Sequence, residues 1–380
     1  MKILHIITSL RMGGAEVALL NRLAAMNNDR YHHKVVCFYD GPIVQQIRAL
    51  GIDVMVNKGF VKGYDPIGLW QLYKVMRNFN PDIIHTSLWA ANMVGRLFGF
   101  IVNIPVINEL HGNVEHEGRV RNGLERLSVR GAKRIVAVSA SVRRVYEQCI
   151  MSGLSIPSKS LITQRLVTIA NGIDRKSLIN KMERTLLSRS DFGFSAQDFI
   201  IGAIGRFEKI KSYDVLIRSV AHLCQLLDEK ERNKIKLCLT GEGSQRHYLQ
   251  VLVQQLKLEK QVVFTGYRLD AFRFYSLFDC FALSSQSEGL SIALLEALAV
   301  GLPIITTHLE KDHDAVIQNV NGLLIPVNDV EAYAQGLLQL YHRRIKKSDD
   351  YSPLCVYPFS IDNVVASYEA MYRDIMIQEE

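Results

Sequence analysis

The chain has 380 residues, of which 48% are hydrophobic and 22% are charged, and its formal net charge is +7. This composition is typical of a folded protein and excludes a largely disordered chain, and the length predicts two domains, each with its own core. Six cysteines occur without any C-x-x-C spacing, which argues against a zinc site or a disulfide framework and favours a reducing, cytoplasmic location.

The beginning of the chain, MKILHIITSLRMGG, has a short apolar run but no small-residue cleavage site. We therefore expect a first strand there and no signal peptide. The longest apolar runs along the chain are interrupted by Arg96 or Glu296. They stay below the ~20 residues that a membrane-spanning helix requires, so we expect a chain that does not cross a bilayer.

In the first half, short β-rich runs alternate with helical stretches, a pattern that indicates a doubly wound parallel sheet. The predicted strands are MKILHIIT, HKVVCFY, DIIHTSL, PVINEL and RIVAVS, and the helices between them include AEVALLNRLAAM and PIGLWQLYKVMRNF. We predict that residues 1–188 form an N-terminal Rossmann-like domain.

After a polar stretch at residues 181–195 the alternation restarts, with the predicted strands FIIGAIG, KIKLCLTG, QVVFTG, CFALSS and LPIITT. This pattern predicts a second Rossmann-like domain over residues 189–358. The last segment, 359–380, carries apolar residues at helical spacing and predicts one amphipathic helix. Those residues are Val364, Val365, Tyr368, Met371, Tyr372 and Ile375. Ligands of open α/β sheets bind at the carboxyl ends of the strands, so the chemistry is expected in loops that follow strands.

Positive charge is concentrated in the first half, which has 26 Lys and Arg against 13 Asp and Glu, whereas the second half has 19 against 25. Much of the excess lies between Arg119 and Arg144, at Arg119, Arg121, Arg126, Arg130, Lys133, Arg134, Arg143 and Arg144. This region is either a face for an anionic membrane surface, where each cation contributes about 1 kcal/mol, or a solvated helix face. Nucleic acid is not predicted, because no aromatic residues interleave with these arginines and no zinc-finger or RRM motif is present.

Three loops that follow predicted strands carry candidate site residues. The first, RMGGAE, places Gly13 and Gly14 before a helix, where their backbone could approach an anion. A plain tight turn is the alternative, because the loop lacks the full G-x-G-x-x-G pattern.

The second loop, GRFEKIKSYD, places Arg206 and Lys211 just beyond a strand end. Two fixed cations suit a diphosphate and would stabilise its charge as a leaving group, although a pair of solvated surface charges remains open.

The third loop, QSEGLS, follows the strand CFALSS and leads into the helix IALLEALAVG, which Gly301 and Pro303 should end. Glu288 lies in the loop, next to the N–H groups that begin a helix near Gly289 to Ser291. Glu296 lies further along a mostly apolar helix, where an unpaired carboxylate is costly. Sugar hydroxyls would satisfy such carboxylates, and a structural salt bridge or a helix cap is the alternative for either residue.

The segments GRFEKIK, LTGEGSQ, VVFTGY, SEGLSIALLEALAVGLPII and NGLLIPVND occur in this order in the second half. In order, spacing and strand context together, they resemble the C-terminal domain of the retaining GT-B glycosyltransferases of family 4 (glycosyltransferase group 1). GGAE, NELHG, VSAS and IANGID in the first half are similar to the same family. The terminal helix resembles the one that crosses back onto the first domain. The resemblance covers essentially the whole chain and implies the GT-B fold, with two facing Rossmann-like domains.

The resemblance also implies roles for the site residues. Arg206 and Lys211 would hold the donor diphosphate, Glu296 would hold the ribose hydroxyls of the nucleotide, and Glu288 would hold the transferred sugar. Backbone contacts to sugar or phosphate would come from Gly289, Leu290 and Ser291, and from Gly13 and Gly14 in the other domain. His111, in NELHG, matches the family's histidine near the sugar, whereas without the resemblance a lone histidine is more often structural.

The implied activity is retaining transfer of a sugar from a nucleotide diphosphate-sugar, best a UDP-sugar, which is a substrate rather than a cofactor. The N-terminal domain would bind a glycan or lipid-linked acceptor of cell-envelope polysaccharide assembly. The location would then be cytoplasmic, either free or bound peripherally to the inner face of the cell membrane. Ser212 departs from the family by standing where a glycine often follows the phosphate-binding lysine.

No metal ion is predicted. The triplet Asp312 to Asp314, DHD, is similar to a metal-binding D-x-D but lies in a loop of a chain with two nucleotide-type domains. HGNVEHE offers His111, Glu115 and His116, yet no further spacing completes a metal shell. Metal-independent transfer, as in the family, is the prediction.

Two rival functions stay open from the sequence. A nucleotide-sugar 2-epimerase shares the twin-domain architecture and would form its product without an acceptor. A non-catalytic nucleotide-sugar-binding protein would bind the donor without turnover. A dinucleotide oxidoreductase is excluded, because MGGAE lacks the glycine pattern that such an enzyme needs.

Overall fold

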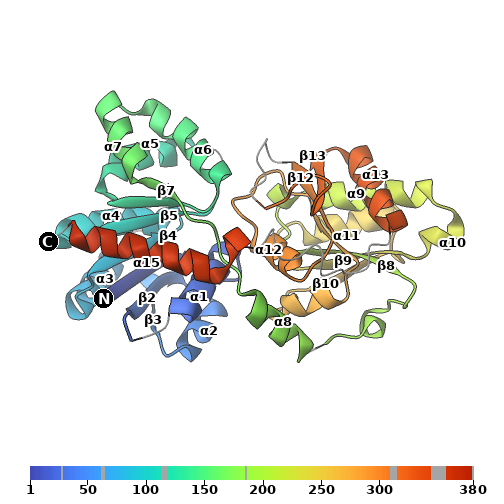
Figure 1. The fold of residues 1–380 in the computed structure, drawn as a ribbon, viewed down its shortest axis with the longest axis horizontal. Coiled ribbons are helices and arrows are strands. Elements are labelled where there is room, and N and C mark those ends of the chain that lie inside the picture. The colour runs from blue at the N-terminus through green and yellow to red at the C-terminus, as the bar shows by residue number, and fades with distance from the viewer. Residues whose placement is uncertain are drawn as a thin grey trace. The chain divides into compact units, whose positions relative to one another are not determined.

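The computed structural model of the protein describes residues 1–26, 29–60, 65–112, 118–184, 186–308, 315–343 and 357–378. The chain divides into two compact units (Figure 1). Unit 1 comprises Met1–Gly172 and Ile361–Glu380, and unit 2 comprises Ile173–Ser360. Each unit is built on one parallel sheet, so the predicted α/β class with two Rossmann-like domains is confirmed.

Unit 1 contains a seven-stranded sheet in the order β3-β2-β1-β4-β5-β6-β7, and all neighbouring strands are parallel. The strands are β1 Lys2–Ser9, β2 His32–Tyr39, β3 Asp53–Val56, β4 Ile83–Ser87, β5 Val106–Leu110, β6 Arg134–Ala137 and β7 Leu166–Thr168. Every residue of β4 and β5 is buried, because helices cover both faces of a doubly wound sheet. Polar residues on these central strands therefore need partners inside the unit.

The helices of unit 1 are α1 Gly14–Met26, α2 Ile43–Ala49, α3 Pro66–Phe79, α4 Trp89–Val102, α5 Arg119–Ser128, α6 Ala140–Cys149, α7 Ile156–Arg165 and α15 Ile361–Ile377. Local signals set their ends. The Asp65 carboxylate accepts a hydrogen bond from the Ile67 N–H at the start of α3, and Asn80 ends this helix in the left-handed conformation.

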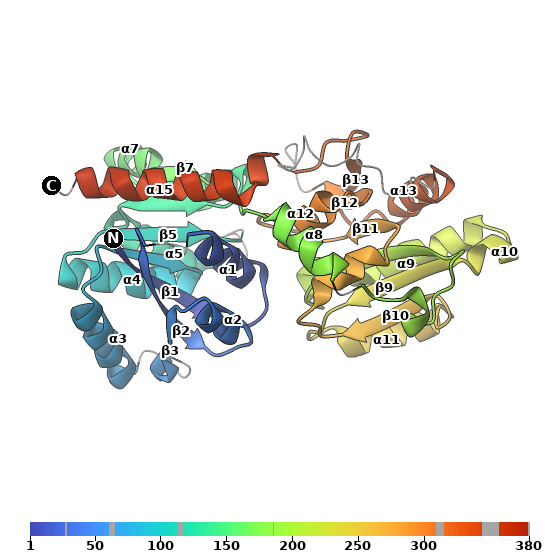
Figure 2. The same cartoon turned by 60° about the horizontal axis from the view of Figure 1, so that its bottom comes forward.

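The C-terminal helix α15 returns to unit 1 and packs beside α1 across the sheet (Figures 1 and 2). Its buried face joins a core with residues of β1, β4, β5 and β6. That face consists of Ile361, Val364, Tyr368, Met371, Tyr372 and Ile375. The predicted amphipathic helix and its return to the first domain are thus confirmed, and two tyrosines of this face enter the polar interior described below.

Unit 2 contains a six-stranded parallel sheet in the order β10-β9-β8-β11-β12-β13. The strands are β8 Phe199–Ile204, β9 Ile235–Thr240, β10 Val262–Gly266, β11 Cys280–Leu283, β12 Ile304–His308 and β13 Gly322–Pro326. The helices are α8 Arg175–Glu183, α9 Tyr213–Leu226, α10 Glu229–Arg232, α11 Arg246–Gln255, α12 Ile292–Ala299 and α13 Val330–Arg343. Helices α9, α11 and α13 share one hydrophobic core with the sheet.

The change from unit 1 to unit 2 lies between Gly172 and Ile173, earlier than the sequence-based boundary after residue 188. Helix α8 explains the difference, because it contacts α12 and the short helix Ala271–Ser276 of unit 2. The polar composition of residues 181–195 therefore marks a surface segment of unit 2. The assignment of acceptor and donor binding to the two domains stays a prediction.

The sheet of unit 2 brings two predicted site loops together. Strands β8 and β11 are parallel neighbours, so the loops that follow Ile204 and Leu283 leave the same edge of the sheet. Helix α12 begins after Ser291 and ends before Gly301, whose φ of 75° suits a glycine. The predicted stop of this helix is confirmed.

Candidate functional site

The loops that follow β8 and β11 are held together by hydrogen bonds between them. The Ser284 hydroxyl donates to the Lys211 carbonyl oxygen at 2.9 Å, and the Gln286 N–H donates to the Ile210 carbonyl oxygen at 2.8 Å. The loop that carries the predicted phosphate-binding cations is therefore fixed against the loop that carries Glu288.

Lys211 and Glu288, two of the predicted site residues, form an ion pair. The Lys211 Nζ lies 2.5 Å from the Glu288 Oε1, and the Ser285 hydroxyl donates to the same oxygen at 2.6 Å. The side chains are 19% and 13% exposed, so the pair is shielded but still reaches the surface. The second Glu288 oxygen makes no hydrogen bond among the described residues, and a carboxylate oxygen in that state accepts sugar hydroxyls.

Arg206 lies in the same loop, two residues after the end of β8, and its side chain is exposed. Within the described part of the chain its guanidinium makes no hydrogen bond or ion pair. The neighbouring Lys209 is also exposed, but it does not take part in the Lys211–Glu288 pair. Arg206 and Lys211 thus present two positive groups from one loop at the carboxyl edge of the sheet.

Glu296 lies on α12, apart from the Lys211–Glu288 pair, and its half-buried carboxylate has a partner of its own. The Tyr275 hydroxyl lies 2.9 Å from the Glu296 Oε2 and also 2.9 Å from the Ala293 carbonyl oxygen. Burial raises the pKa of Glu296 to about 7, although the Tyr275 hydrogen bond and the positive charge of Lys181 act in the opposite direction. A carboxyl with this pKa changes its charge near neutral pH.

The segment Gly289, Leu290 and Ser291 connects Glu288 to α12. Ser291 is the N-cap of this helix, and its hydroxyl accepts a hydrogen bond from the Leu294 N–H at 3.4 Å. Leu290 is buried, which anchors the segment in unit 2. These residues lie where the resemblance places backbone contacts to the donor, and that role stays a prediction.

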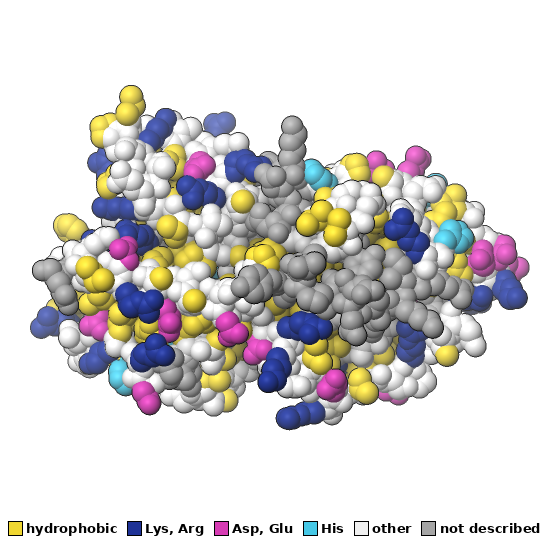
Figure 3. Space-filling view, in the orientation of Figure 1, with side chains coloured by type: hydrophobic (Ala, Val, Ile, Leu, Met, Phe, Trp, Pro, Cys, Tyr) yellow, Lys and Arg dark blue, Asp and Glu magenta, His cyan; other side chains and the backbone are white. Residues whose placement is uncertain are grey.

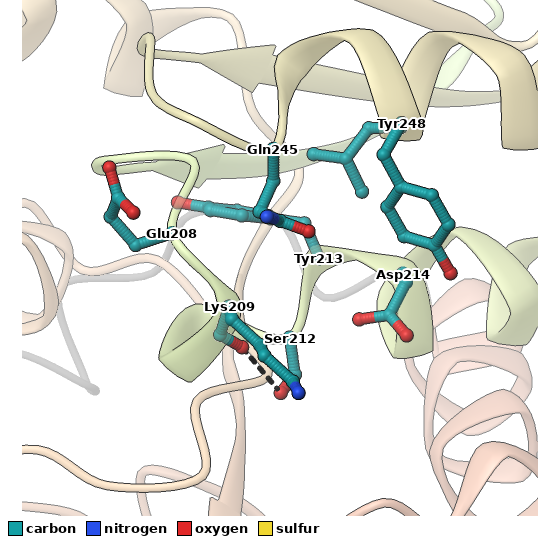
Figure 4. Close-up of a pocket in the computed structure, with 8 residues that line it drawn as sticks. Glu208, Lys209, Ser212, Tyr213, Asp214, Gln245 and Tyr248 are labelled. Atoms are coloured by element: carbon teal, nitrogen blue, oxygen red, sulfur yellow. Dashed lines mark hydrogen bonds between the residues drawn. The ribbon is translucent and has the colours of Figure 1, made fainter. Parts of the chain in front are cut away.

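A separate cavity of about 140 Å³ lies beside the same loop, between the first turns of α9 and α11 (Figure 4). It is lined by Glu208, Lys209, Ser212, Tyr213, Asp214, Gln245, Tyr248 and Leu249, and no predicted site residue is among these. Two of the lining side chains are carboxylates, which disfavour a phosphate group there. The cavity therefore does not replace the predicted donor site.

In unit 1, His111 directly follows β5, and its largely buried imidazole points to a carboxylate. The His111 Nε2 lies 3.2 Å from the Glu109 Oε2. Gly13 and Gly14 lie where β1 leads into α1. A Cβ on Gly13 would lie 2.5 Å from the Glu16 carboxylate, whereas a Cβ on Gly14 would meet nothing within 4 Å. A side chain at position 13 would therefore displace the Glu16 carboxylate, whereas the space at position 14 is open.

Glu109 is a polar centre that the sequence-based prediction did not include among the site residues. Its side chain is 2% exposed and receives hydrogen bonds from Arg22 of α1, Ser87 of β4 and Tyr368 of α15. Burial alone raises the pKa of Glu109, but the positive charge of Arg22 and the hydrogen bond from His111 outweigh it and hold the pKa well below its usual range. A glutamate inside the predicted strand PVINEL, two residues before His111, was the available sequence signal.

The basic region between Arg119 and Arg144 has several internal contacts. Arg126 donates to the carbonyl oxygens of Cys149 and Ile150, and Arg130 donates to a serine hydroxyl, so both keep their net charge. Carboxylates pair with two others, namely Arg134 with Asp374 and Arg143 with Glu147. Part of the predicted basic face is therefore neutralised, while Arg119 is exposed.

Across the described ranges, no group of three or more His, Cys, Asp or Glu side chains is arranged to hold a metal ion. The triplet Asp312 to Asp314, and also Glu115 and His116, lie outside the described residues. Within the same ranges, no helix combines the length and the apolar composition needed to span a bilayer.

Two family models match the chain. The model for "Glycosyltransferase Family 4" matches residues 12–177, and the model for "Glycosyl transferases group 1" matches residues 186–353. The chain belongs to the family 4, group 1 glycosyltransferases. Its activity is accordingly that of a glycosyltransferase, and the alternative of a nucleotide-sugar 2-epimerase is not favoured.

Relatives across the family support this assignment. The glycosyltransferase is 22% identical over 396 residues to the UDP-Gal:alpha-D-GlcNAc-diphosphoundecaprenol alpha-1,3-galactosyltransferase of Escherichia coli, over 100% of this chain and 98% of that protein. It is 26% identical over 345 residues to the N-acetyl-alpha-D-glucosaminyl L-malate synthase of Bacillus anthracis, over 85% of this chain and 84% of that protein.

Solved structures show the same fold. The crystal structure of HepE from Anabaena in complex with UDP-glucose aligns with a TM-score of 0.80 and 21% identity, over 98% of this chain and 100% of HepE. The fold of this glycosyltransferase is therefore GT-B, as predicted, with the seven-stranded and six-stranded sheets described above.

Proposed function

We propose that this glycosyltransferase moves a sugar from a UDP-sugar to a lipid-linked or polysaccharide acceptor of the cell envelope, with retention of configuration and without a metal ion or cofactor. The observation that carries the proposal is the Lys211–Glu288 pair beside the exposed Arg206, at the carboxyl edge of β8 and β11. This arrangement combines cations for a diphosphate with a carboxylate for sugar hydroxyls.

In the proposed reaction, the bond between the anomeric carbon and the diphosphate breaks, and the diphosphate leaves with its electron pair. Arg206 and Lys211 stabilise the negative charge that grows on it. The acceptor hydroxyl attacks from the same face, forms the new C–O bond and passes its proton to a departing phosphate oxygen. Glu288 orients the transferred sugar, and Glu296 accepts hydrogen bonds from the ribose hydroxyls.

The names of relatives support the donor and acceptor classes. HepE was crystallised with UDP and with UDP-glucose, and the pneumococcal O-GlcNAc transferase GtfA was crystallised with UDP and GlcNAc. The Escherichia coli relative is named for transfer from UDP-Gal to a diphosphoundecaprenol-linked sugar. A uridine nucleotide donor and a lipid-linked acceptor are therefore the first substrates to test.

The donor is tested by thermal melting with UDP, UDP-sugars, GDP-sugars and ADP-sugars, each with and without EDTA. We expect the Tm to rise with UDP and UDP-sugars and the rise to survive EDTA. Lys211→Met should abolish the rise, whereas Lys209→Met, which changes an exposed lysine two residues away, should keep it. No shift with any uridine nucleotide, or equal loss in both variants, would refute the donor site.

The product is tested with the UDP-sugar that gives the largest shift and with undecaprenyl diphosphate-linked GlcNAc as the first acceptor. We expect an α-linked product from an α-linked donor, which the proton NMR coupling of the anomeric hydrogen identifies. A β-linked product would contradict retention. Conversion of the donor without an acceptor would support the epimerase instead, and binding without any turnover would support a non-catalytic protein.

We further propose that unit 1 docks on an anionic membrane surface through exposed apolar residues of α4 and α5. Exposed apolar side chains lie at helical spacing on each helix: Leu97, Phe100 and Ile101 on α4, and Val120, Leu124 and Leu127 on α5. We call these six residues the α4–α5 apolar face. Phe100, Leu127 and Val120 are 86%, 81% and 78% exposed, which is unusual for large apolar side chains that are close in the fold.

Contacts between the two helices support a common side for both stripes. The Arg96 Nη2 of α4 lies 2.5 Å from the Glu125 Oε1 of α5, and the Ser128 hydroxyl lies 3.4 Å from the Met93 sulfur. Phe100 follows Arg96 by one turn and Leu124 precedes Ser128 by one turn, so both flank this contact. Lys and Arg side chains gather over the part of unit 1 that carries α5, α6 and α7 (Figure 3).

Vesicle flotation tests this docking with phosphatidylcholine vesicles and with vesicles that also contain phosphatidylglycerol. We expect binding to the anionic vesicles only, with loss of binding in the double variant Phe100→Ser and Leu127→Ser. Ile67→Ser is the matched control, because it removes an apolar side chain that is 62% exposed on α3. Equal binding of both variants, or no binding by the wild-type protein, would refute the membrane proposal.

A further inference from the structure

The interior of unit 1 contains a buried carboxylate, Glu109, that no step of the proposed reaction uses. It lies on β5 two residues before His111, so both side chains leave the same face of the sheet. Its side chain is only 2% exposed, and substrate therefore cannot contact it directly. Any effect of Glu109 on catalysis has to act through its neighbours.

Hydrogen-bond donors from three elements surround the Glu109 carboxylate. Arg22 of α1 contacts both oxygens, the Ser87 hydroxyl donates to Oε2 at 2.7 Å, and the Tyr368 hydroxyl of α15 donates to Oε1. The Arg22 guanidinium also lies 4.3 Å from the centre of the Tyr368 ring. These contacts fill most of the acceptor capacity of the carboxylate and hold it ionised in one orientation.

The backbone of Glu109 is fixed as well. The Asn92 side-chain amide of α4 donates to the Glu109 carbonyl oxygen at 3.1 Å. With both its side chain and its carbonyl held, Glu109 cannot follow a movement of the imidazole. The His85 Nε2 also lies 3.8 Å from Oε2, beyond hydrogen-bonding distance. Among the described residues, the remaining hydrogen bond of the carboxylate, 3.2 Å from Oε2 to the His111 Nε2, therefore sets the position of the imidazole ring.

An ionised carboxylate is only a hydrogen-bond acceptor, so the His111 nitrogen that faces it must carry a proton. In the neutral ring the other nitrogen, Nδ1, then has a lone pair and accepts hydrogen bonds. Within the described ranges Nδ1 makes no hydrogen bond. The arrangement thus leaves one defined acceptor for a hydroxyl group.

We propose that Glu109 is a positioning residue: it fixes His111 with the proton on Nε2, so that Nδ1 accepts a hydrogen bond from a sugar hydroxyl. Tyr368 of the C-terminal helix and Arg22 of α1 hold Glu109 for this task. The inference rests on the proposed function, because it requires a sugar at His111. It also connects α15 to His111 through Glu109, beyond the packing of this helix in the core.

Two tyrosines of α15 supply a matched pair of variants. Tyr368 donates to Glu109, whereas Tyr372, one turn further along the same helix, is hydrogen-bonded to the His85 Nδ1 at 2.7 Å. Both are fully buried, so Tyr368→Phe and Tyr372→Phe should lower the Tm by similar amounts. Only Tyr368→Phe should lower kcat, by about tenfold, with little change in the KM for the donor.

The protonated nitrogen is observed directly by nitrogen NMR of protein labelled in its histidines, with His111→Gln to assign the signal. We expect the wild-type protein to carry the proton on Nε2, and Glu109→Gln to give a mixture of both neutral forms.

The outcomes separate the two proposals. Wild-type turnover in His111→Ala would refute the predicted contact between His111 and a sugar, and the positioning role with it, but would leave the donor site at Lys211 and Glu288 standing. Reduced turnover in His111→Ala, together with wild-type kcat and an unchanged imidazole signal in Tyr368→Phe and Glu109→Gln, would refute the positioning role alone. Equal kcat losses in Tyr368→Phe and Tyr372→Phe would show a general packing effect and also refute it.

Discussion

Donor binding is expected to strengthen as the pH rises from 6 to 8, because Glu296 must be ionised to accept hydrogen bonds from two ribose hydroxyls. Burial raises the pKa of this carboxyl to about 7. With that pKa about a tenth of the molecules carry the carboxylate at pH 6, and about nine tenths carry it at pH 8. If only the ionised form binds the ribose, the Kd for a UDP-sugar falls about tenfold across this range.

Isothermal titration calorimetry with UDP-glucose measures this dependence. The diphosphate of this ligand is esterified at both ends and does not titrate near neutrality, so the protein causes any slope. Glu296→Gln should bind more weakly at pH 8 and lose the pH dependence. Glu259→Gln, which changes an exposed carboxylate of the same unit, should keep it. A flat wild-type profile, or a slope that survives in Glu296→Gln, would refute this role of the carboxyl group.

The raised pKa of Glu296 also predicts how the stability of the protein depends on pH. The pKa of Glu296 is higher in the folded state than in the unfolded state. Below about pH 4.5 the carboxyl is protonated in both states, so its ionisation does not change the free energy of unfolding. Between that pH and about 7 the unfolded state ionises first, which destabilises the folded state by up to about 3 kcal/mol. Glu296→Gln should therefore gain stability over the wild-type protein at pH 8 but not at pH 4, as urea unfolding measures.

Three further variants test other parts of the structure. Arg206→Ala should lower kcat more than it raises the donor KM, because its charge is needed most on the leaving diphosphate; steady-state kinetics that show a change in KM alone would contradict this. Arg96→Ala removes the cation from the buried Glu125 carboxylate, which keeps only the Tyr146 hydroxyl as a hydrogen-bond donor among the described residues, and should cost about 3–5 kcal/mol in urea unfolding. Gly202→Ala places a Cβ 2.0 Å from a phenylalanine ring and should cost at least about 1–3 kcal/mol, so an unchanged Tm would contradict the packing described for β8.

The strands that could be predicted from the sequence are those with long buried runs. β1, β2, β4, β5 and β6 of unit 1 coincide with predicted runs, as do β8 to β12 of unit 2. β3, β7 and β13 were not predicted, and each lies at the end of its sheet. β3 and β7 each contain one buried residue, whereas the equally short β6 and β11 contain three and four, so only the latter show a continuous buried run. Pairing with an existing neighbour defines these edge strands.

In the candidate site, too, some residues could be predicted from the sequence and others could not. Charged residues in loops after strands were predictable, because parallel topology brings such loops to one edge. The partners that set their properties were not, since they come from distant parts of the chain. Tyr275 contacts Glu296, and Tyr368 contacts Glu109 across 259 positions of sequence. No spacing rule connects residues so far apart, so only the fold reveals the two networks.

The Lys211–Glu288 pair leads to a last prediction, which separates two roles of Glu288. The Glu288 carboxylate partly neutralises the ammonium group that the diphosphate needs, since the two lie 2.5 Å apart. Glu288→Gln should therefore bind UDP, which lacks the sugar, more tightly than the wild-type protein, because one repulsive charge is removed. Its kcat with a UDP-sugar should nevertheless fall, because the contact to the sugar is weakened. Weaker UDP binding in calorimetry would instead show that Glu288 acts mainly by holding Lys211 in place.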